Sequence, residues 1–156
     1  MTVSRRVFIK KMLSLGMVAV ALRSDIVYAS LDNIRRIKDN FNPEPYQKIL
    51  ARVFNQTRFI NSRKIAFSRL PRVAENGAVV PITVSSSIEN ISKISILVEN
   101  NPHPLIAEFY LSPYVSAHVS ARIKMAKTSK VIAIVEADGK FYRKAKKVKV
   151  VKGGCG

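Results

Sequence analysis

The sequence predicts an all-β protein, a two-sheet antiparallel sandwich with a short helical lead-in. Three observations support this fold class. From Lys64 onward, apolar residues recur at every second position, as they do on strands with one buried face. Turn signals containing Gly, Asn or Pro separate six or seven such runs. Helical spacing is confined to residues 31–55, so the helical part precedes the strands and does not alternate with them.

Two apolar stripes make up the helical lead-in, which we place at residues 31–55. The first stripe is Leu31, Ile34, Ile37 and Phe41, and the second is Tyr46, Ile49, Leu50 and Val53. Two prolines at 43 and 45 interrupt them. Stripes of this kind are typical of core contacts, so we assign no functional site to them.

The first predicted strands lie on either side of a turn. Residues 64–69 alternate before Leu70-Pro71, and residues 78–86 alternate again. Between them, 75–77 (ENG) indicates a turn, because Asn and Gly tolerate a positive φ. Pro81 within the second run favours an edge strand or a bulge, since proline cannot donate to a ladder.

Four further runs complete the expected sandwich. Residues 94–98 and 105–111 flank a rigid loop, 100–104, that contains two prolines. Residues 115–125 give the clearest alternation, with Val115 at the start of the inward face. Residues 131–137 are apolar on both faces, which predicts a central strand.

The last strand follows a hairpin. Asp138-Gly139 is typical of a tight β-turn. Tyr142, Val148 and Val150 form the apolar side of this strand, and many of its other residues are lysines. Edge strands often carry lysine to block aggregation, so we interpret it as an edge strand.

The N-terminus resembles an export signal. Arg5-Arg6 precedes Phe8 and Lys10, an apolar run of 11 residues follows, and small residues precede Ser30. The run is well short of the roughly 20 residues that a membrane-spanning helix needs. We therefore expect residues 1–29 to be a twin-arginine signal cleaved after Ala29, leaving no membrane anchor. Residues 30–152 then form one periplasmic domain.

The C-terminus carries the one cysteine of the chain, Cys155, in the sequence Gly153-Gly154-Cys155-Gly156. Glycine adds no side chain to pack and gives the backbone wide freedom. We therefore expect residues 153–156 to be a mobile arm that presents a single thiol. An odd cysteine in an exported protein is either a reactive thiol or an intermolecular disulfide. Lys152, next to the arm, is expected to favour the thiolate and to attract anions.

Composition restricts the possible partners. The formal net charge is +17 at pH 7, which favours anions or acidic proteins. The basic residues are not interleaved with aromatic side chains, so nucleic acid is not expected. His103 and His118 lack the spacing of metal ligands, so we predict neither metal nor cofactor. A glycine-flanked thiol has no fixed neighbour to activate it, so the chain resembles a substrate carrier and not an enzyme.

Several segments, taken in order with the export signal, resemble the SoxY family, the sulfur-carrying subunits of the periplasmic thiosulfate-oxidising (Sox) system. They are residues 71–77 (PRVAENG), 80–84 (VPITV), 101–104 (NPHP), 122–124 (RIK), 137–140 (ADGK) and 153–156 (GGCG). The chain stops one glycine short of the usual Gly-Gly-Cys-Gly-Gly ending. We expect the nearer terminal carboxylate to disfavour the thiolate of Cys155.

The resemblance implies an immunoglobulin-like sandwich that forms a heterodimer with a SoxZ subunit. It also implies that Cys155 carries thiosulfate and related sulfur anions as S-thiosulfonate and persulfide. The implied partners are a haem-containing conjugating enzyme, a sulfate-releasing hydrolase and, where present, a sulfur dehydrogenase. Two alternatives remain. One is an exported interaction module that uses Cys155 as an intermolecular disulfide staple, and the weaker one is a thiol–disulfide redox protein.

Overall fold

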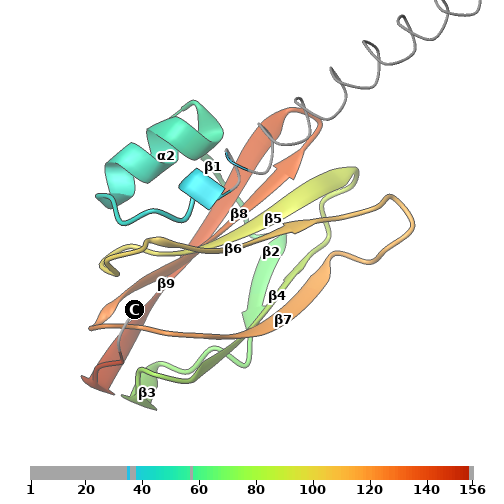
Figure 1. The fold of residues 1–156 in the computed structure, drawn as a ribbon. Coiled ribbons are helices and arrows are strands. Elements are labelled where there is room, and N and C mark those ends of the chain that lie inside the picture. Colours follow the sequence, from blue (N-terminus) through green and yellow to red (C-terminus); the bar gives the residue numbers. More distant parts are fainter. Residues whose placement is uncertain (1–34, 36–37, 57, 155–156) are drawn as a thin grey trace, which may run out of the picture. The chain divides into compact units, whose positions relative to one another are not determined.

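The computed structural model describes residues 35, 38–56 and 58–154, and their strands form two sheets packed face to face (Figure 1). The elements after residue 40 are α2 (Tyr46–Phe54), β1 (Ile60–Asn61), β2 (Ile65–Ser68), β3 (Val73–Asn76), β4 (Val80–Ser86), β5 (Ile91–Val98), β6 (Leu105–Tyr110), β7 (His118–Ile123), β8 (Ser129–Ala137) and β9 (Lys140–Lys152). The signal expected at 1–29 lies outside the described residues.

The sheets confirm the predicted sandwich. The larger sheet has the order β1-β9-β8-β5-β6, with β3 also paired to β9, and the smaller sheet has the order β2-β4-β7. The pairings within β2-β4-β7 and β9-β8-β5-β6 are antiparallel. The short strands β1 and β3 pair with β9 in parallel, and sequence reasoning predicted neither of them.

β8 is the central strand that its two-sided apolar pattern predicted. Val131, Ala133 and Val135 face the smaller sheet and belong to the main core. Ile132 and Ile134 face the other way and pack in a second apolar cluster with residues of α2. A slip of one residue would exchange the side chains between these two cores, so the register of this strand is strongly specified.

α2 covers the outer face of the larger sheet (Figure 1). It begins after Pro45, whose fixed φ suits a helix start, and it ends at Asn55 in the left-handed conformation. The predicted second stripe is confirmed, since Ile49 and Leu50 are buried. Phe54, which the stripe did not include, packs edge-on against Phe59 and Phe141. Of the first stripe, only Phe41 lies among the described residues, and it packs beside the same cluster.

The two predicted turns are both present, but for different reasons. Asp138 and Gly139 have φ values of 48° and 68°, as a tight hairpin requires. The turn at Gly77 and Ala78 follows β3, but neither Asn76 nor Gly77 has a positive φ. The reason proposed for that turn was therefore wrong, and the glycine there meets a different requirement described below.

Two details of the strand predictions need correction. β4 is the middle strand of its sheet, not an edge, but β2 pairs only with residues 83–86 and so ends before Pro81. Proline is tolerated there because one side of the strand is locally open. The run predicted at 115–125 is a strand only at His118–Ile123, and Val115 is 58% exposed, not inward-facing.

The edge interpretation of the last strand is wrong at both ends of β9 and correct in its middle. β1 pairs with residues 142–143 and β3 with residues 149–152, on the side of β9 away from β8. Between these pairings, Lys144 and Lys146 are half-buried and donate from Nζ to the carbonyls of Ile65 and Leu70, each at 2.6 Å. These lysines therefore bridge the two sheets where β9 has no ladder partner among the described residues, as inward-pointing charges do at protected edges.

A buried charge cluster lies on the helix-facing side of the larger sheet. Lys93 Nζ lies 3.2 Å from Glu108 Oε1 and 3.3 Å from Glu136 Oε2, and the Glu108 side chain is only 3% exposed. Lys93 also lies over the rings of Phe54 and Tyr110. Burial alone would lower the pKa of Lys93, but the charge and hydrogen bond of Glu108, then the charge of Glu136, outweigh it and raise the pKa above 10.5.

We predict that Lys93→Met destabilises the fold by about 3 kcal/mol, because it leaves the Glu108 carboxylate buried without its cation. The shift of the chemical-denaturation midpoint measures this loss. The double variant Lys93→Met/Glu108→Gln is the control, and it should recover most of the stability. Equal midpoints for the single variant and the parent chain would contradict the prediction.

The same cluster gives a pH dependence. Because the folded pKa of Lys93 is raised, its contribution is fully present below the unfolded value of 10.5 and is lost as pH rises through the folded pKa. The stability of the parent chain relative to the double variant should therefore be constant around neutral pH and should fall as the pH rises through the folded pKa of Lys93, above 10.5, as denaturation midpoints across alkaline pH would show.

Candidate functional site

The predicted carrier segment begins where β9 ends. Lys152, the last residue of β9, pairs with Asn76 of β3 and is exposed. Gly153 and Gly154 follow it and are the last residues that the structure describes. Cys155 and Gly156, which follow Gly154 in the sequence, lie outside the described residues.

Three backbone hydrogen bonds hold this end of the chain to two turns of the sandwich. Gly77 N donates to Lys152 O at 2.7 Å, and Met125 N donates to Gly77 O at 2.7 Å. Gly154 N then donates to Met125 O at 3.0 Å. The turn after β3 and the loop after β7 therefore form a seat for residues 152–154, which we call the arm seat (residues 77–78 and 125–126).

The contact between the arm and the arm seat leaves room only for glycine at three positions, one in the seat and two in the arm. A Cβ at Gly77 would lie 2.2 Å from Met125 O and 2.9 Å from Gly154 N. One at Gly153 would lie 2.2 Å from Ala126 O, and one at Gly154 would lie 2.5 Å from both Cα and N of Ala78. All these neighbours are backbone atoms, which cannot swing aside as a side chain can. In the structure, these glycines are needed because two backbone segments approach each other too closely for a side chain, and not because the backbone needs a conformation that only glycine adopts.

Asn101 anchors one wall of the seat. The residue is 5% exposed, and its side chain makes two hydrogen bonds to the loop after β7. Nδ2 donates to Lys124 O at 2.8 Å, and Oδ1 accepts from Ala126 N at 2.9 Å. Asn101 thus links the loop between β5 and β6 to the residues that contact Gly153 and Gly154.

Four of the motifs noted in the sequence therefore meet at one place. Residues 71–77 end in the seat's glycine, 101–104 supply Asn101, 122–124 lead into Met125, and 153–156 begin with the seated glycines. Sequence reasoning used them together as a family signature but did not place them near one another. An asparagine in a proline-rich loop and a glycine after a strand have many ordinary roles, so only the fold shows that they act on the same backbone.

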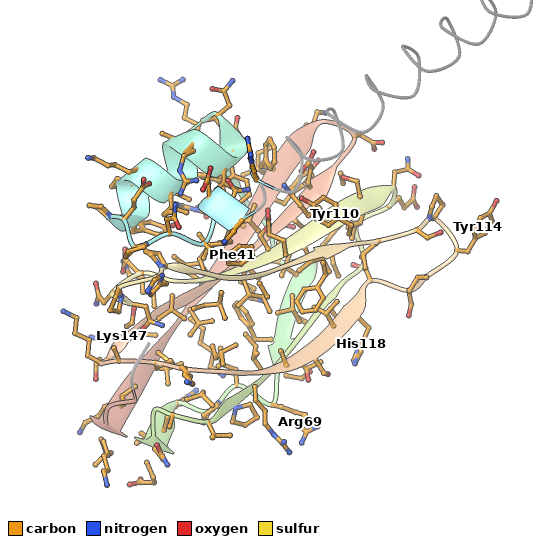
Figure 2. The ribbon with its side chains drawn as sticks, viewed as in Figure 1. Phe41, Arg69, Tyr110, Tyr114, His118 and Lys147 are labelled. Atoms are coloured by element: carbon orange, nitrogen blue, oxygen red, sulfur yellow. The ribbon has the colours of Figure 1, made fainter. Side chains whose placement is uncertain are left out.

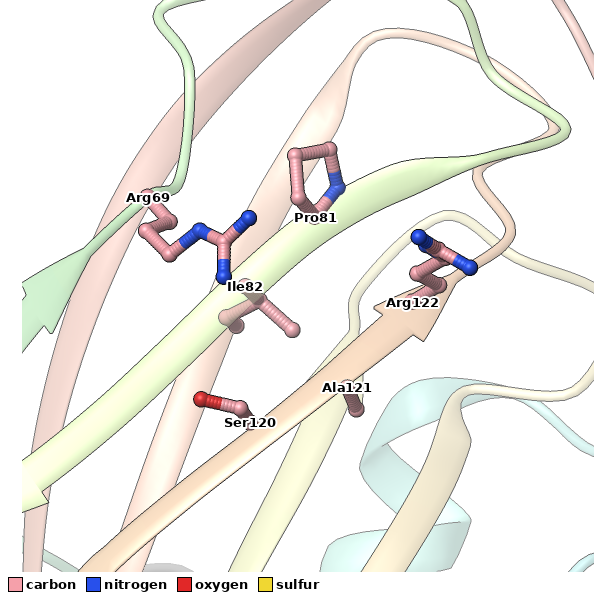
Figure 3. A pocket seen from close by; sticks show the side chains of 6 residues that line it. All are labelled: Arg69, Pro81, Ile82, Ser120, Ala121 and Arg122. Atoms are coloured by element: carbon pink, nitrogen blue, oxygen red, sulfur yellow. The ribbon is translucent and has the colours of Figure 1, made fainter.

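A basic hollow of about 230 Å³ lies on the outer face of the smaller sheet (Figure 3). Arg69 and Arg122 reach over it from opposite sides, with Pro81 and Ser120 between them. Arg69 has a φ of 57° at the end of β2. Both arginines are exposed, and neither guanidinium forms an ion pair within the described part of the chain. Sequence reasoning did not single out this pair, because the two arginines are far apart in the sequence.

The two histidines lie apart from each other in the structure. His103 Nδ1 lies 2.9 Å from the carbonyl oxygen of Phe41, and His118 lies exposed on β7, well away from Phe41 (Figure 2). Over the residues that the structure describes, no group of three His, Cys, Asp or Glu side chains is placed to hold a metal ion. In the same residues, no helix is long and apolar enough to cross a membrane.

Comparisons with known proteins agree with the motif evidence. The family model for sulfur oxidation protein SoxY matches residues 50–155. The solved structure of the sulfur carrier protein SoxY from Chlorobium limicola f thiosulfatophilum is 38% identical, with a TM-score of 0.61, over 68% of this chain and 96% of that chain. No curated protein matches the chain.

A second solved structure shares the fold alone. Superoxide reductase (neelaredoxin) from Ignicoccus hospitalis is 17% identical, with a TM-score of 0.50, over 56% of this chain and 79% of that chain. The identity with the Chlorobium carrier and the match of the family model to more than half of the chain, up to the residue that bears the thiol, carry the assignment. The chain belongs to the SoxY family of sulfur oxidation proteins.

Proposed function

We propose that this chain carries sulfur intermediates of thiosulfate oxidation as covalent adducts of Cys155 and presents them to partner enzymes. Membership of the SoxY family supports a sulfur-carrier role in the periplasmic Sox system. The observation that carries the assignment to Cys155 is that the family match runs through residue 155, the one cysteine in the sequence. The role makes the chain a substrate carrier and not a catalyst.

The proposed cycle begins with oxidative conjugation. The Cys155 thiolate and thiosulfate form a sulfur–sulfur bond, leaving cysteine S-thiosulfonate, and the two electrons released pass one at a time to a haem-containing partner enzyme, which hands them on to an electron acceptor. Water then attacks the terminal sulfone in a partner hydrolase, which releases sulfate and two protons and leaves a persulfide on Cys155. Further oxidation of that sulfane sulfur would require a sulfur dehydrogenase. The chain supplies the nucleophile, and thiolate is its reactive form.

The charge of the body suits anionic cargo. Lys152 is exposed beside the arm seat, and Lys124, on the adjoining loop, is exposed as well. Positive charge near the thiol favours both the thiolate and the approach of thiosulfate. The basic hollow of Arg69 and Arg122 adds to the same field at longer range. We further propose a SoxZ-like partner subunit and export by the twin-arginine route. The export signal is supported by residues 1–29 of the sequence.

We predict that Cys155 bears reductant-removable adducts in cells grown on thiosulfate. Intact mass spectrometry of the purified chain should show added sulfur or thiosulfonate before reduction and a bare thiol after it. Cys155→Ser should carry no adduct and should not support thiosulfate-dependent reduction of the haem partner. A bare thiol, or only a cysteine-linked dimer, under both growth conditions would instead support the interaction module.

We predict that Lys152→Gln slows the reaction of Cys155 with an anionic thiol reagent about two-fold, the size of one charge acting over roughly 10 Å in water. Stopped-flow rates with matched anionic and uncharged reagents separate attraction of the reagent from the amount of thiolate. Lys140→Gln, an exposed lysine at the far end of β9, is the matched control and should have no effect.

Screening provides a second check on the same variant. The difference between the parent chain and Lys152→Gln should disappear at about 1 M salt, where the Debye length is about 3 Å. A difference that persists at high salt would assign the effect to altered arm structure and not to charge.

A further inference from the structure

We propose that the carrier arm has a docked state, in which Gly153 and Gly154 occupy the arm seat, and that Asn101 is the positioning residue that maintains this seat. The biological meaning of this state rests on the proposed function. The docked state itself rests on the contacts of residues 77–78, 101, 125–126 and 153–154.

Both the arm and the arm seat contribute glycines to the contact between them. Gly77 must lack a side chain so that Gly154 can approach, and Gly154 must lack one so that Ala78 can approach. Gly153 meets the same condition against Ala126. Three positions from two distant parts of the sequence therefore exclude a Cβ at the same junction. A freely moving linker would need none of these exclusions on the body side.

Asn101 holds the wall against which the arm docks. Its amide nitrogen and its carbonyl oxygen bond on either side of Met125, whose own carbonyl receives the Gly154 N–H. Met125 itself is fully buried in the core. The loop is thus fixed at Lys124, Met125 and Ala126, and the acceptor for the arm is presented from a rigid support.

The docked arm is held weakly enough to be released. Beyond β9, a single hydrogen bond and the close packing of two glycines retain it within the described part of the chain. One such bond changes an equilibrium by about five-fold. Release of residues 153–154 would extend the reach of the thiol by about 7 Å, two residues of extended chain. In the docked state the thiol would therefore stay close to the sandwich, near Lys152. A partner that draws residues 153–154 out of the seat would let the thiol extend farther from it.

The single cysteine makes the docked state directly measurable. A nitroxide attached to Cys155 of the full chain reports arm motion in its electron paramagnetic resonance spectrum. We expect the parent chain to show a slow, immobilised component. Gly154→Ala should increase the mobile component by about five-fold or more, because the added Cβ cannot enter the seat.

The sign of that change discriminates between the two models of the arm. In an arm that never docks, the alanine substitution would reduce backbone freedom next to the label and slow its motion. Gly139→Asn is the control, because Gly139 lies at the distal hairpin with open space around it and asparagine tolerates its positive φ of 68°. It should leave the label spectrum unchanged. A slower or unchanged label in Gly154→Ala would overturn the proposal.

Asn101→Asp tests the positioning residue without altering the arm. At neutral pH a carboxylate cannot donate to Lys124 O, so the label should become more mobile. At acidic pH the protonated side chain can donate to Lys124 O and accept from Ala126 N–H, so the immobilised component should return. A label that is equally immobile at both pH values would exclude a positioning role for Asn101.

The two proposals fail separately. The label experiment needs no sulfur compound, so loss of the docked state would leave the adducts on Cys155 unaffected. Conversely, a chain without thiosulfate adducts could still show the docked arm. In that case the arm seat would stand and the carrier function would not.

Discussion

The two-sided pairing of β9 is the constraint on which the rest of the structure depends. Its residues 140–148 pair with β8, the strand buried on both faces, and its other side receives β1 near one end and β3 at the other. The parallel pairing with β3 continues to Lys152, so the chain leaves the sandwich at a fixed point beside the turn at Gly77. The position of the carrier segment follows from where this strand ends.

Most of the sandwich could be predicted because its signals are local. The apolar pattern of 131–137 identified the central strand, and Asp138-Gly139 identified the hairpin. The second helical stripe identified two of the three buried residues of α2, Ile49 and Leu50. These features depend on periodicity or on backbone conformation, and both are determined by residues that are neighbours in the sequence. The parallel strands β1 and β3 could not be predicted, because strands of two and four residues have almost no pattern and acquire their place only from β9.

The candidate site also has one part that the sequence could predict and one part that it could not. Cys155 is conspicuous in the sequence, and the family comparison reaches it. The surroundings of Gly153 and Gly154 depend on contacts between residues far apart in the sequence, so no local rule could reveal them. The turn at Gly77 illustrates the difficulty, because the residue types suggested a positive φ and the structure uses the missing side chain instead. Likewise the lysines of the last strand suggested an edge along its whole length. Only the fold shows that both ends of β9 are paired and that, between these pairings, Lys144 and Lys146 bridge two sheets.

The close approach at Gly77 has a consequence for transplanting the arm. A Gly-Gly-Cys-Gly tail fused to the last strand of another sandwich would carry the thiol but would lack the glycine turn and the asparagine-braced loop that receive it. If the arm docks as proposed, such a chimera would have a longer and less controlled tether than the natural protein. The smallest portable unit is therefore the tail together with two loops from elsewhere in the chain, and the boundary of the functional module does not coincide with any continuous segment of sequence.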